Sequence, residues 1–205
     1  MSRWQPIAIV AFAFLWATAS EVIGATMTFD DLPLGTLFGA PVGDQPGFPV
    51  HEQDGIVMSV EQIIVEGAAG FLRAEVGGRY AGFFSSRPLD LNNISVGFDF
   101  RQVGFEVNQV SLEFVELGPL NNFSVNDAAL FELPSLQLIP TDIAPGVTAV
   151  VTDGVITLSG AIDKILIGGQ ELAIDTILAI PEPTTLLLLG IGGTALVRLR
   201  RRRLS

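Results

Sequence analysis

The sequence predicts an all-β fold, an antiparallel β-sandwich that lies between an N-terminal signal peptide and a single C-terminal transmembrane helix. Short segments in which every second residue is apolar recur along the chain, separated by Gly, Pro, Asn and Asp. The chain contains no cysteine, and outside its two apolar ends no window of helical length shows a helical apolar stripe. About ten strands of this kind, without disulfides or helices, are typical of a sandwich, and we expect a jelly-roll topology.

Residues 1–25 are typical of a secretion signal. Arg3 gives the positive N-terminal region, residues 7–17 are apolar over the length expected of a signal-peptide core, and small residues follow. We favour cleavage after Ala25, because the strand-like part of the chain begins at the next residue. A small-residue site at Ala17-Thr18-Ala19 and an uncleaved signal anchor are the alternatives. The signal predicts that the following residues are exported.

Residues 26–180 are expected to form one exported domain. The domain begins with a short β-rich segment, residues 26–29, and continues into a Gly/Pro-rich stretch up to residue 49 that we predict as loop. The clearest alternation lies in residues 93–100 and 109–117, where apolar residues at every second position predict a buried face. That face consists of Ile94, Val96, Phe98, Phe100, Val110, Leu112 and Phe114.

Two dipeptides predict tight hairpin turns in this domain. Asp153-Gly154 is the strongest signal, because Asp and Gly both tolerate the left-handed backbone that a two-residue turn requires. Gly77-Gly78 has the same spacing between β-rich segments. The expected strands are residues 147–152 and 155–158 around the first turn, and residues 70–76 and 79–85 around the second.

The predicted domain is strongly acidic. The whole chain holds 22 acidic and 11 basic residues, and two of the acidic and six of the basic ones lie outside residues 26–180. The domain therefore keeps twenty acidic and five basic residues, a formal charge of about −15. A surface of this kind repels phosphate backbones and anionic lipid, so we expect no nucleic-acid partner, whereas divalent cations suit it as counterions.

No motif in the sequence predicts catalysis. The only histidine, His51, stands beside Glu52 and Asp54 in a polar stretch, and no nucleophile or phosphate-binding motif accompanies it. Glu113 and Glu116 are three residues apart, so on a strand they point to opposite faces and form a poor acid/base pair. We therefore expect that the protein is not an enzyme. A secreted hydrolase ranks third among the functions that the sequence suggests.

The C-terminal residues 181–205 combine three features. Pro181-Glu182-Pro183 comes first, an apolar run over residues 186–197 follows, and an arginine cluster comes last. At about 1.5 Å per residue the run is short for a hydrocarbon core of about 30 Å, which favours a provisional single-helix anchor. Under the positive-inside rule the arginines stay in the cytoplasm and stop transfer there. They are Arg198, Arg200, Arg201, Arg202 and Arg203.

These three features, in this order, resemble the PEP-CTERM sorting signal of Gram-negative bacteria. The resemblance implies that a membrane-embedded exosortase recognises Pro181-Glu182-Pro183 and processes the tail, in a host that makes exopolysaccharide or biofilm matrix. It also implies a route: export, anchoring in the inner membrane with the domain in the periplasm, and transfer to the cell surface or extracellular matrix after processing. An ordinary tail anchor with a chance Pro-Glu-Pro is the alternative.

The two ends of the domain carry a second, looser resemblance. The segment from Phe29 to Pro33 and the segment from Ile167 to Asp175 look like parts of other PEP-CTERM exported domains, which are similar to carbohydrate-binding jelly rolls. The first and last strands of such sandwiches often lie side by side. The resemblance thus suggests a calcium site, and its ligands would be Asp30, Asp31 and Asp175. Solvated carboxylates at strand ends are the other interpretation, and no obligatory cofactor is expected.

The sequence therefore predicts an exported cell-surface or matrix-associated protein with a structural or binding role, sorted by an exosortase. Matrix glycan is the partner suggested beyond the processing enzyme. The alternative function is a calcium-assisted carbohydrate-binding module. The scarcity of exposed aromatic residues counts against it, because Tyr80 is the only tyrosine and both tryptophans lie in the signal peptide.

Overall fold

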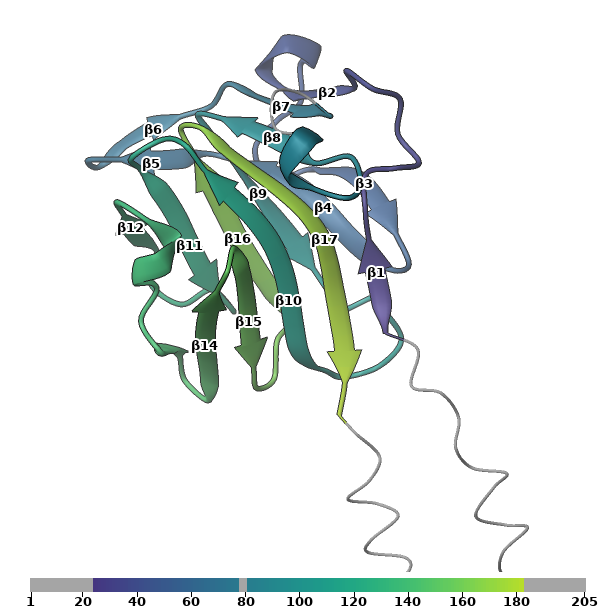
Figure 1. Ribbon diagram of the computed structural model, residues 1–205, viewed down its shortest axis with the longest axis vertical. Coiled ribbons are helices and arrows are strands. Elements are labelled where there is room, and N and C mark those ends of the chain that lie inside the picture. Colours follow the sequence, from purple (N-terminus) through teal and green to yellow (C-terminus); the bar gives the residue numbers. More distant parts are fainter. Residues whose placement is uncertain (1–23, 78–80, 183–205) are drawn as a thin grey trace, which may run out of the picture.

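A computed structural model of the protein describes residues 24–77 and 81–182 (Figure 1). The signal peptide up to residue 23, Pro183, the apolar run and the arginine cluster lie outside the described residues. Within these ranges no helix is long and apolar enough to cross a membrane. The helix predicted for residues 186–197 also lies outside them.

Nine strands form the larger of two antiparallel sheets (Figure 1). Their bounds are β1 Ala25–Met27, β2 Leu37–Gly39, β7 Arg73–Val76, β8 Leu89–Asn92, β10 Val107–Glu116, β13 Asp142–Ala144, β14 Val147–Thr152, β15 Val155–Ser159 and β17 Leu172–Pro181. The order across the sheet is β13-β14-β15-β10-β17-β8-β7-β2. The short strand β1 is not part of this order and also pairs with β17. The last strand in the sequence is therefore a central strand of the sheet.

Six strands form the second sheet, in the order β12-β11-β16-β9-β4-β3. Their bounds are β3 Pro49–Gln53, β4 Ile56–Glu61, β9 Ile94–Asp99, β11 Asn121–Val125, β12 Phe131–Leu133 and β16 Lys164–Gly169. A separate hairpin joins β5 (Ile63–Val65) to β6 (Ala68–Gly70), and three short 3-10 turns are η1 (Ala40–Val42), η2 (Ala81–Phe83) and η3 (Leu136–Leu138). The prediction of an all-β, antiparallel fold is confirmed, and the two layers are those of a β-sandwich (Figure 1).

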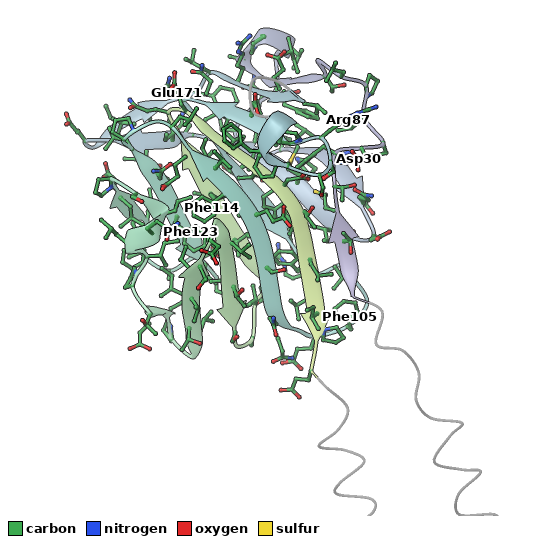
Figure 2. All side chains as sticks on the ribbon, viewed as in Figure 1. Asp30, Arg87, Phe105, Phe114, Phe123 and Glu171 are labelled. Atoms are coloured by element: carbon green, nitrogen blue, oxygen red, sulfur yellow. The ribbon has the colours of Figure 1, made fainter. Side chains whose placement is uncertain are left out.

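One hydrophobic core fills the space between the two sheets. Phe114 of β10 and Phe123 of β11 contribute to it from the two sides (Figure 2). Every residue of the face predicted from the alternation is buried, and none is more than 4% exposed: Ile94, Val96, Phe98, Phe100, Val110, Leu112 and Phe114. The period of two therefore identified the inner face of β9 and β10 correctly.

The hairpin predicted at Asp153-Gly154 is confirmed. β14 and β15 meet across it, with Thr152 opposite Val155. Both turn residues have a positive φ, 51° for Asp153 and 79° for Gly154, which is the backbone that a two-residue turn between twisted strands requires.

The hairpin predicted at Gly77-Gly78 is wrong. β7 pairs with β8 and β2 instead, and residues 81–83 form the 3-10 turn η2. In the predicted second strand, residues 79–85, the aromatic residues Tyr80, Phe83 and Phe84 favour a strand but Ala81 and Gly82 do not, so the local preference is weak. Pairing with a strand further along the chain buries more apolar surface and prevails.

The first and last described strands lie side by side. β1 runs antiparallel to the end of β17, with Ala25 opposite Ala179. β8 pairs with the beginning of the same edge, at residues 172–174, and β10 covers the opposite edge. The expectation that the terminal strands are neighbours is met, and Gly24 and Glu182 lie at the same end of the sandwich (Figure 1).

Candidate functional site

Asp175 lies in β17 at the point where one edge of the strand passes from β8 to β1. The register with β10 shifts here: Ser111 lies opposite Leu178, but Glu113 lies opposite Asp175, so β17 contains one extra residue. Thr176 accommodates this β-bulge with a φ of 42°, which is rare for a β-branched residue. The side chain of Asp175 is completely buried beside the bulge.

The buried carboxylate of Asp175 has polar partners. The Ser86 hydroxyl donates to Oδ2, and the Thr176 N–H donates to Oδ1 at 2.7 Å. Burial raises the pKa of Asp175, the hydrogen bonds from Ser86 and Thr176 partly oppose this, and the negative charge of Asp30 adds to the increase. Burial also raises the pKa of Glu113, and the charge of Asp175 contributes. Asp175 is therefore a solvent-shielded carboxyl group inside the sheet, whereas its neighbour Glu113 is only partly buried.

The other two residues of the suggested calcium site have different partners. Asp30 Oδ1 accepts a hydrogen bond from the Arg87 N–H at 3.0 Å, and Arg87 Nη1 donates to the Asp30 carbonyl oxygen at 3.2 Å (Figure 2). Asp31 Oδ1 instead lies 3.8 Å from His51 Nε2. The fold thus brings Asp30 near Asp175 and directs Asp31 toward β3. Across the described ranges, no group of three or more His, Cys, Asp or Glu side chains is arranged to hold a metal ion.

The side chains of Glu116 and His51 make contacts within the fold. Glu116 accepts hydrogen bonds from Asn121 Nδ2 at 2.9 Å, from Ser135 Oγ at 2.8 Å and from the Leu136 N–H. The last two attach η3 to the end of β10, and the first joins β10 to β11. The ring of His51 packs against Phe29, with 6.5 Å between the ring centroids.

A polar groove crosses the outer face of the six-stranded sheet. It consists of two adjoining hollows of about 190 and 400 Å³, which have four lining residues in common: Gly47, Glu61, Lys164 and Leu166. The strand register explains its floor, because Ser59 of β4, Gly97 of β9 and Leu166 of β16 lie opposite one another. Gly97 has no side chain to fill the space above the sheet, and it lines the smaller hollow over β9.

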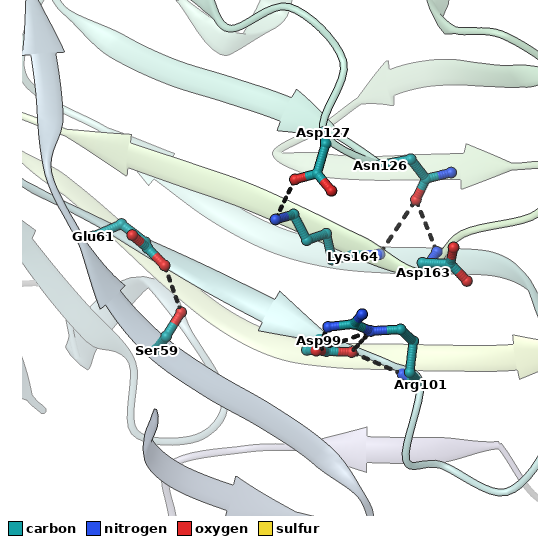
Figure 3. A network of polar contacts seen from close by, with 8 residues as sticks. All are labelled: Ser59, Glu61, Asp99, Arg101, Asn126, Asp127, Asp163 and Lys164. Carbon is teal, nitrogen blue, oxygen red and sulfur yellow. Dashed lines mark hydrogen bonds and ion pairs between the residues drawn. The ribbon is translucent and has the colours of Figure 1, made fainter. Parts of the chain in front are cut away.

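The charged side chains of the groove are held in pairs (Figure 3). Arg101 Nε lies 2.9 and 3.1 Å from the two carboxylate oxygens of Asp99, and the guanidinium forms an ion pair with it. Lys164 forms an ion pair with Asp127. The hydrogen bond from Arg101 lowers the pKa of Asp99, although partial burial opposes this. The groove is thus charged at neutral pH.

Loops and a hairpin bound the groove. The Gly47 N–H donates to the Val60 carbonyl oxygen at 2.8 Å, which holds the loop before β3 against β4 and leaves Phe48 64% exposed beside the groove. At the other boundary the β5–β6 hairpin covers the sheet: Asn122 Oδ1 accepts from the Ile64 N–H at 2.6 Å and Nδ2 donates to the Ile64 carbonyl oxygen at 2.8 Å. These contacts fix the size of the groove.

Sequence reasoning did not identify this groove. The alternation in residues 93–100 predicts that Ser95, Gly97 and Asp99 lie on the outer face. Gly97 and Asp99 do line the groove, whereas the prediction for Ser95 is wrong, because this residue is completely buried. The partners that complete the lining come from β4, β11 and β16, which are distant in the sequence. Only the order of the strands brings them together.

The predicted sorting motif begins inside β17. Pro181 is the last residue of the strand and lies opposite Val107 of β10, and the exposed Glu182 follows it directly. Ala25, the predicted cleavage position, is the first residue of β1 and is 4% exposed. Pro183 and the five arginines lie outside the described residues.

A comparison with protein families finds the PEP-CTERM protein-sorting motif at residues 179–203. The matched range contains the Pro-Glu-Pro segment, the apolar run and the arginine cluster, together with two preceding residues of β17. No curated protein and no solved structure matches the chain significantly. The motif implies export and membrane-anchored sorting before processing by an exosortase. The chain therefore carries a PEP-CTERM sorting motif, joined without a spacer to an antiparallel β-sandwich.

Proposed function

We propose that this protein is a non-catalytic structural or binding component of the cell surface or of an exopolysaccharide matrix, delivered there after an exosortase removes its tail. The observation that carries the proposal is the sorting motif at residues 179–203, which begins in the last strand of a folded sandwich. A domain with this tail is brought to the membrane and then separated from it. Its role at its destination depends on what its surface binds.

The strand order supports a jelly-roll topology for the domain. Within the two sheets, four central strands follow the order β8-β17-β10-β15 and four follow the order β9-β16-β11-β12. Lettered B to I in chain order, these strands read BIDG and CHEF, which is the order of a jelly roll with two Greek keys. The remaining strands extend the edges of the two sheets.

The polar groove supports a neutral polysaccharide as the ligand. Its lining presents hydroxyl, carboxylate and ammonium groups side by side, so it offers acceptors and donors to a ligand that is rich in hydroxyl groups. Phe48, which stands in the chain between the lining residues Gly47 and Pro49, is an exposed aromatic residue. Carboxylates outnumber cations in the lining, which disfavours polyanions: the charged residues are Glu61, Asp99, Asp127, Arg101 and Lys164.

A single substitution tests the groove. Gly97→Ala adds a Cβ whose nearest neighbours are the side-chain atoms Ser59 Oγ at 2.8 Å and Glu61 Oε1 at 3.5 Å, so the fold can adjust while the floor is raised. We expect the affinity for neutral polysaccharide purified from the host's matrix to fall at least about tenfold in titration calorimetry. Gly82→Ala, which meets no atom within 4 Å, is the matched control and should bind like the wild type.

Two outcomes contradict this ligand. Equal binding by Gly97→Ala and the wild type would exclude the groove, and stronger binding of anionic than of neutral polysaccharide would contradict the charge argument. Repeating the titration with a chelator separates the alternatives: unchanged binding supports the groove alone, whereas loss of binding supports the calcium-assisted module.

The sorting step is tested in the producing host. Pro181-Glu182-Pro183 is replaced by three alanines, and the intact mass and cell fraction of the protein are compared with those of the native form. We expect the native protein to lose the arginine tail and leave the inner membrane, and the variant to keep both tail and membrane location. Glu132→Ala, an exposed carboxylate in β12, is the control and should be sorted normally. A native protein that retains its tail would contradict the proposal.

A further inference from the structure

β17 is engaged in the sheet right up to the sorting motif. On one edge Val107 of β10 lies opposite Pro181, and on the other edge Thr26 of β1, the first residue expected after signal cleavage, lies opposite Leu178. Ala179 is completely buried. Pro181 also lacks an N–H group. Ile180 and Pro181 are partly exposed, and Glu182 is the first residue at this end of the strand that is in the exposed class.

An enzyme that cuts a chain has to hold it extended, and main-chain hydrogen bonds supply much of that contact. Over most of β17 these groups face β10 on one side and β8 or β1 on the other, and Ile180 and Pro181 at its end pair with β10 alone. A strand with two neighbours cannot take a third. Presenting residues before Pro181 to an enzyme would require the strand end to leave the sheet and expose its buried side chains.

We infer that the folded domain fixes the upstream limit of tail processing, so that the bond cut lies after Glu182 and the mature protein keeps β17 complete. This inference rests on the proposed sorting by an exosortase. In the reaction a peptide C–N bond breaks, and its carbonyl carbon bonds to the oxygen of water or to a nucleophilic oxygen or nitrogen of an acceptor. The proton of that nucleophile passes to the nitrogen of the departing tail.

The first test is the C-terminal residue of the mature protein. The full chain is expressed in its host, and the protein that has left the inner membrane is analysed by intact mass and C-terminal peptide mapping. We expect one main species that ends at Glu182 or later. A mature protein that ends at Pro181 or earlier would overturn the inference while leaving the proposed function intact. If no processed protein forms, the proposed function fails instead.

The second test weakens the end of β17. Ile177 is completely buried opposite Met27 of β1, so Ile177→Ala leaves a cavity where the two terminal strands meet. We expect the share of mature molecules that end before Pro181 to rise at least about tenfold, because local fraying exposes the strand. Ile156→Ala is the matched control: this isoleucine is 1% exposed but lies in β15, which does not pair with β17. It should leave the C-terminus unchanged.

A milder variant keeps the test decisive if Ile177→Ala does not accumulate. Ile177→Val removes one methyl group from the same site and should shift the C-terminus in the same direction by a smaller amount. If both Ile177 variants give the wild-type C-terminus, the fold does not set the limit. If Ile156→Ala gives the same upstream ends as Ile177→Ala, general instability explains them and the inference fails as well.

Discussion

Gly168→Ala is expected to destabilise the domain strongly. Gly168 lies in β16 between Asn122 of β11 and Ser95 of β9. A Cβ at this position would lie 2.6 Å from both Cα and Cβ of Ser95, far inside van der Waals contact. Because the Cα belongs to the backbone of the neighbouring strand, β16 and β9 would have to separate locally. Overpacking costs about 1–3 kcal/mol, and we expect about 3 kcal/mol here, since no side-chain rotation removes the overlap.

Thermal and urea unfolding of the purified protein measure this effect. A loss of about 3 kcal/mol corresponds to a decrease in Tm of roughly 6–12 °C for a domain of this size. Gly82→Ala, with no atom within 4 Å of the added Cβ, should change the free energy of unfolding by less than about 0.5 kcal/mol. Combining Gly168→Ala with Ser95→Gly should restore only part of the loss, because the backbone contact remains.

Two results would refute this reasoning. The first is a Tm for Gly168→Ala within about 2 °C of the wild type, which would show that the strands separate at little cost. The second is complete rescue by Ser95→Gly, measured against the single Ser95→Gly variant, which would show that only the side chain of Ser95 was in the way.

Glu116→Ala removes the acceptor of three hydrogen bonds, two from the start of η3 and one from Asn121 of β11, so we expect the free energy of unfolding in urea to fall by about 2–3 kcal/mol, and an unchanged unfolding midpoint would contradict this role. Asp175→Asn tests the raised pKa of Asp175. The stability of the fold that is linked to this raised pKa is fully present below the unfolded-state pKa, and it is lost as the pH rises through the folded-state pKa. The stability of the wild type relative to Asp175→Asn should therefore decrease in urea unfolding as the pH rises above about 4, and a difference that grows with pH would contradict the sign. Glu113→Gln should show the same direction, because burial also raises the pKa of Glu113.

Features that depend on neighbours along the chain could be predicted from the sequence. In a strand the side chains alternate between the two faces, so apolar residues at every second position identify the buried face of β9 and β10 without knowledge of their partners. The Asp153-Gly154 turn follows from the backbone preferences of two adjacent residues. The sorting motif is likewise a contiguous segment, and the family comparison finds it at residues 179–203.

The Gly77-Gly78 prediction shows where local reasoning stops. The dipeptide permits a tight turn, but β7 pairs with β2, which precedes it in the chain, and with β8, which follows it. Neither strand is joined to β7 by a two-residue turn. Strand pairing is decided by the burial and hydrogen bonding of the whole sheet, so a local turn signal can be overruled.

The sequence by itself determined the fold class, the inner faces of the strands and the sorting signal, because each depends on residues that are close along the chain. Tertiary structure alone decided the polar groove, since Ser59, Gly97 and Leu166 become neighbours only through the order of β4, β9 and β16. It also decided that β17 is a central strand that continues directly into the motif. Both features depend on which distant strands pair, and that choice is made by the free energy of the complete sandwich.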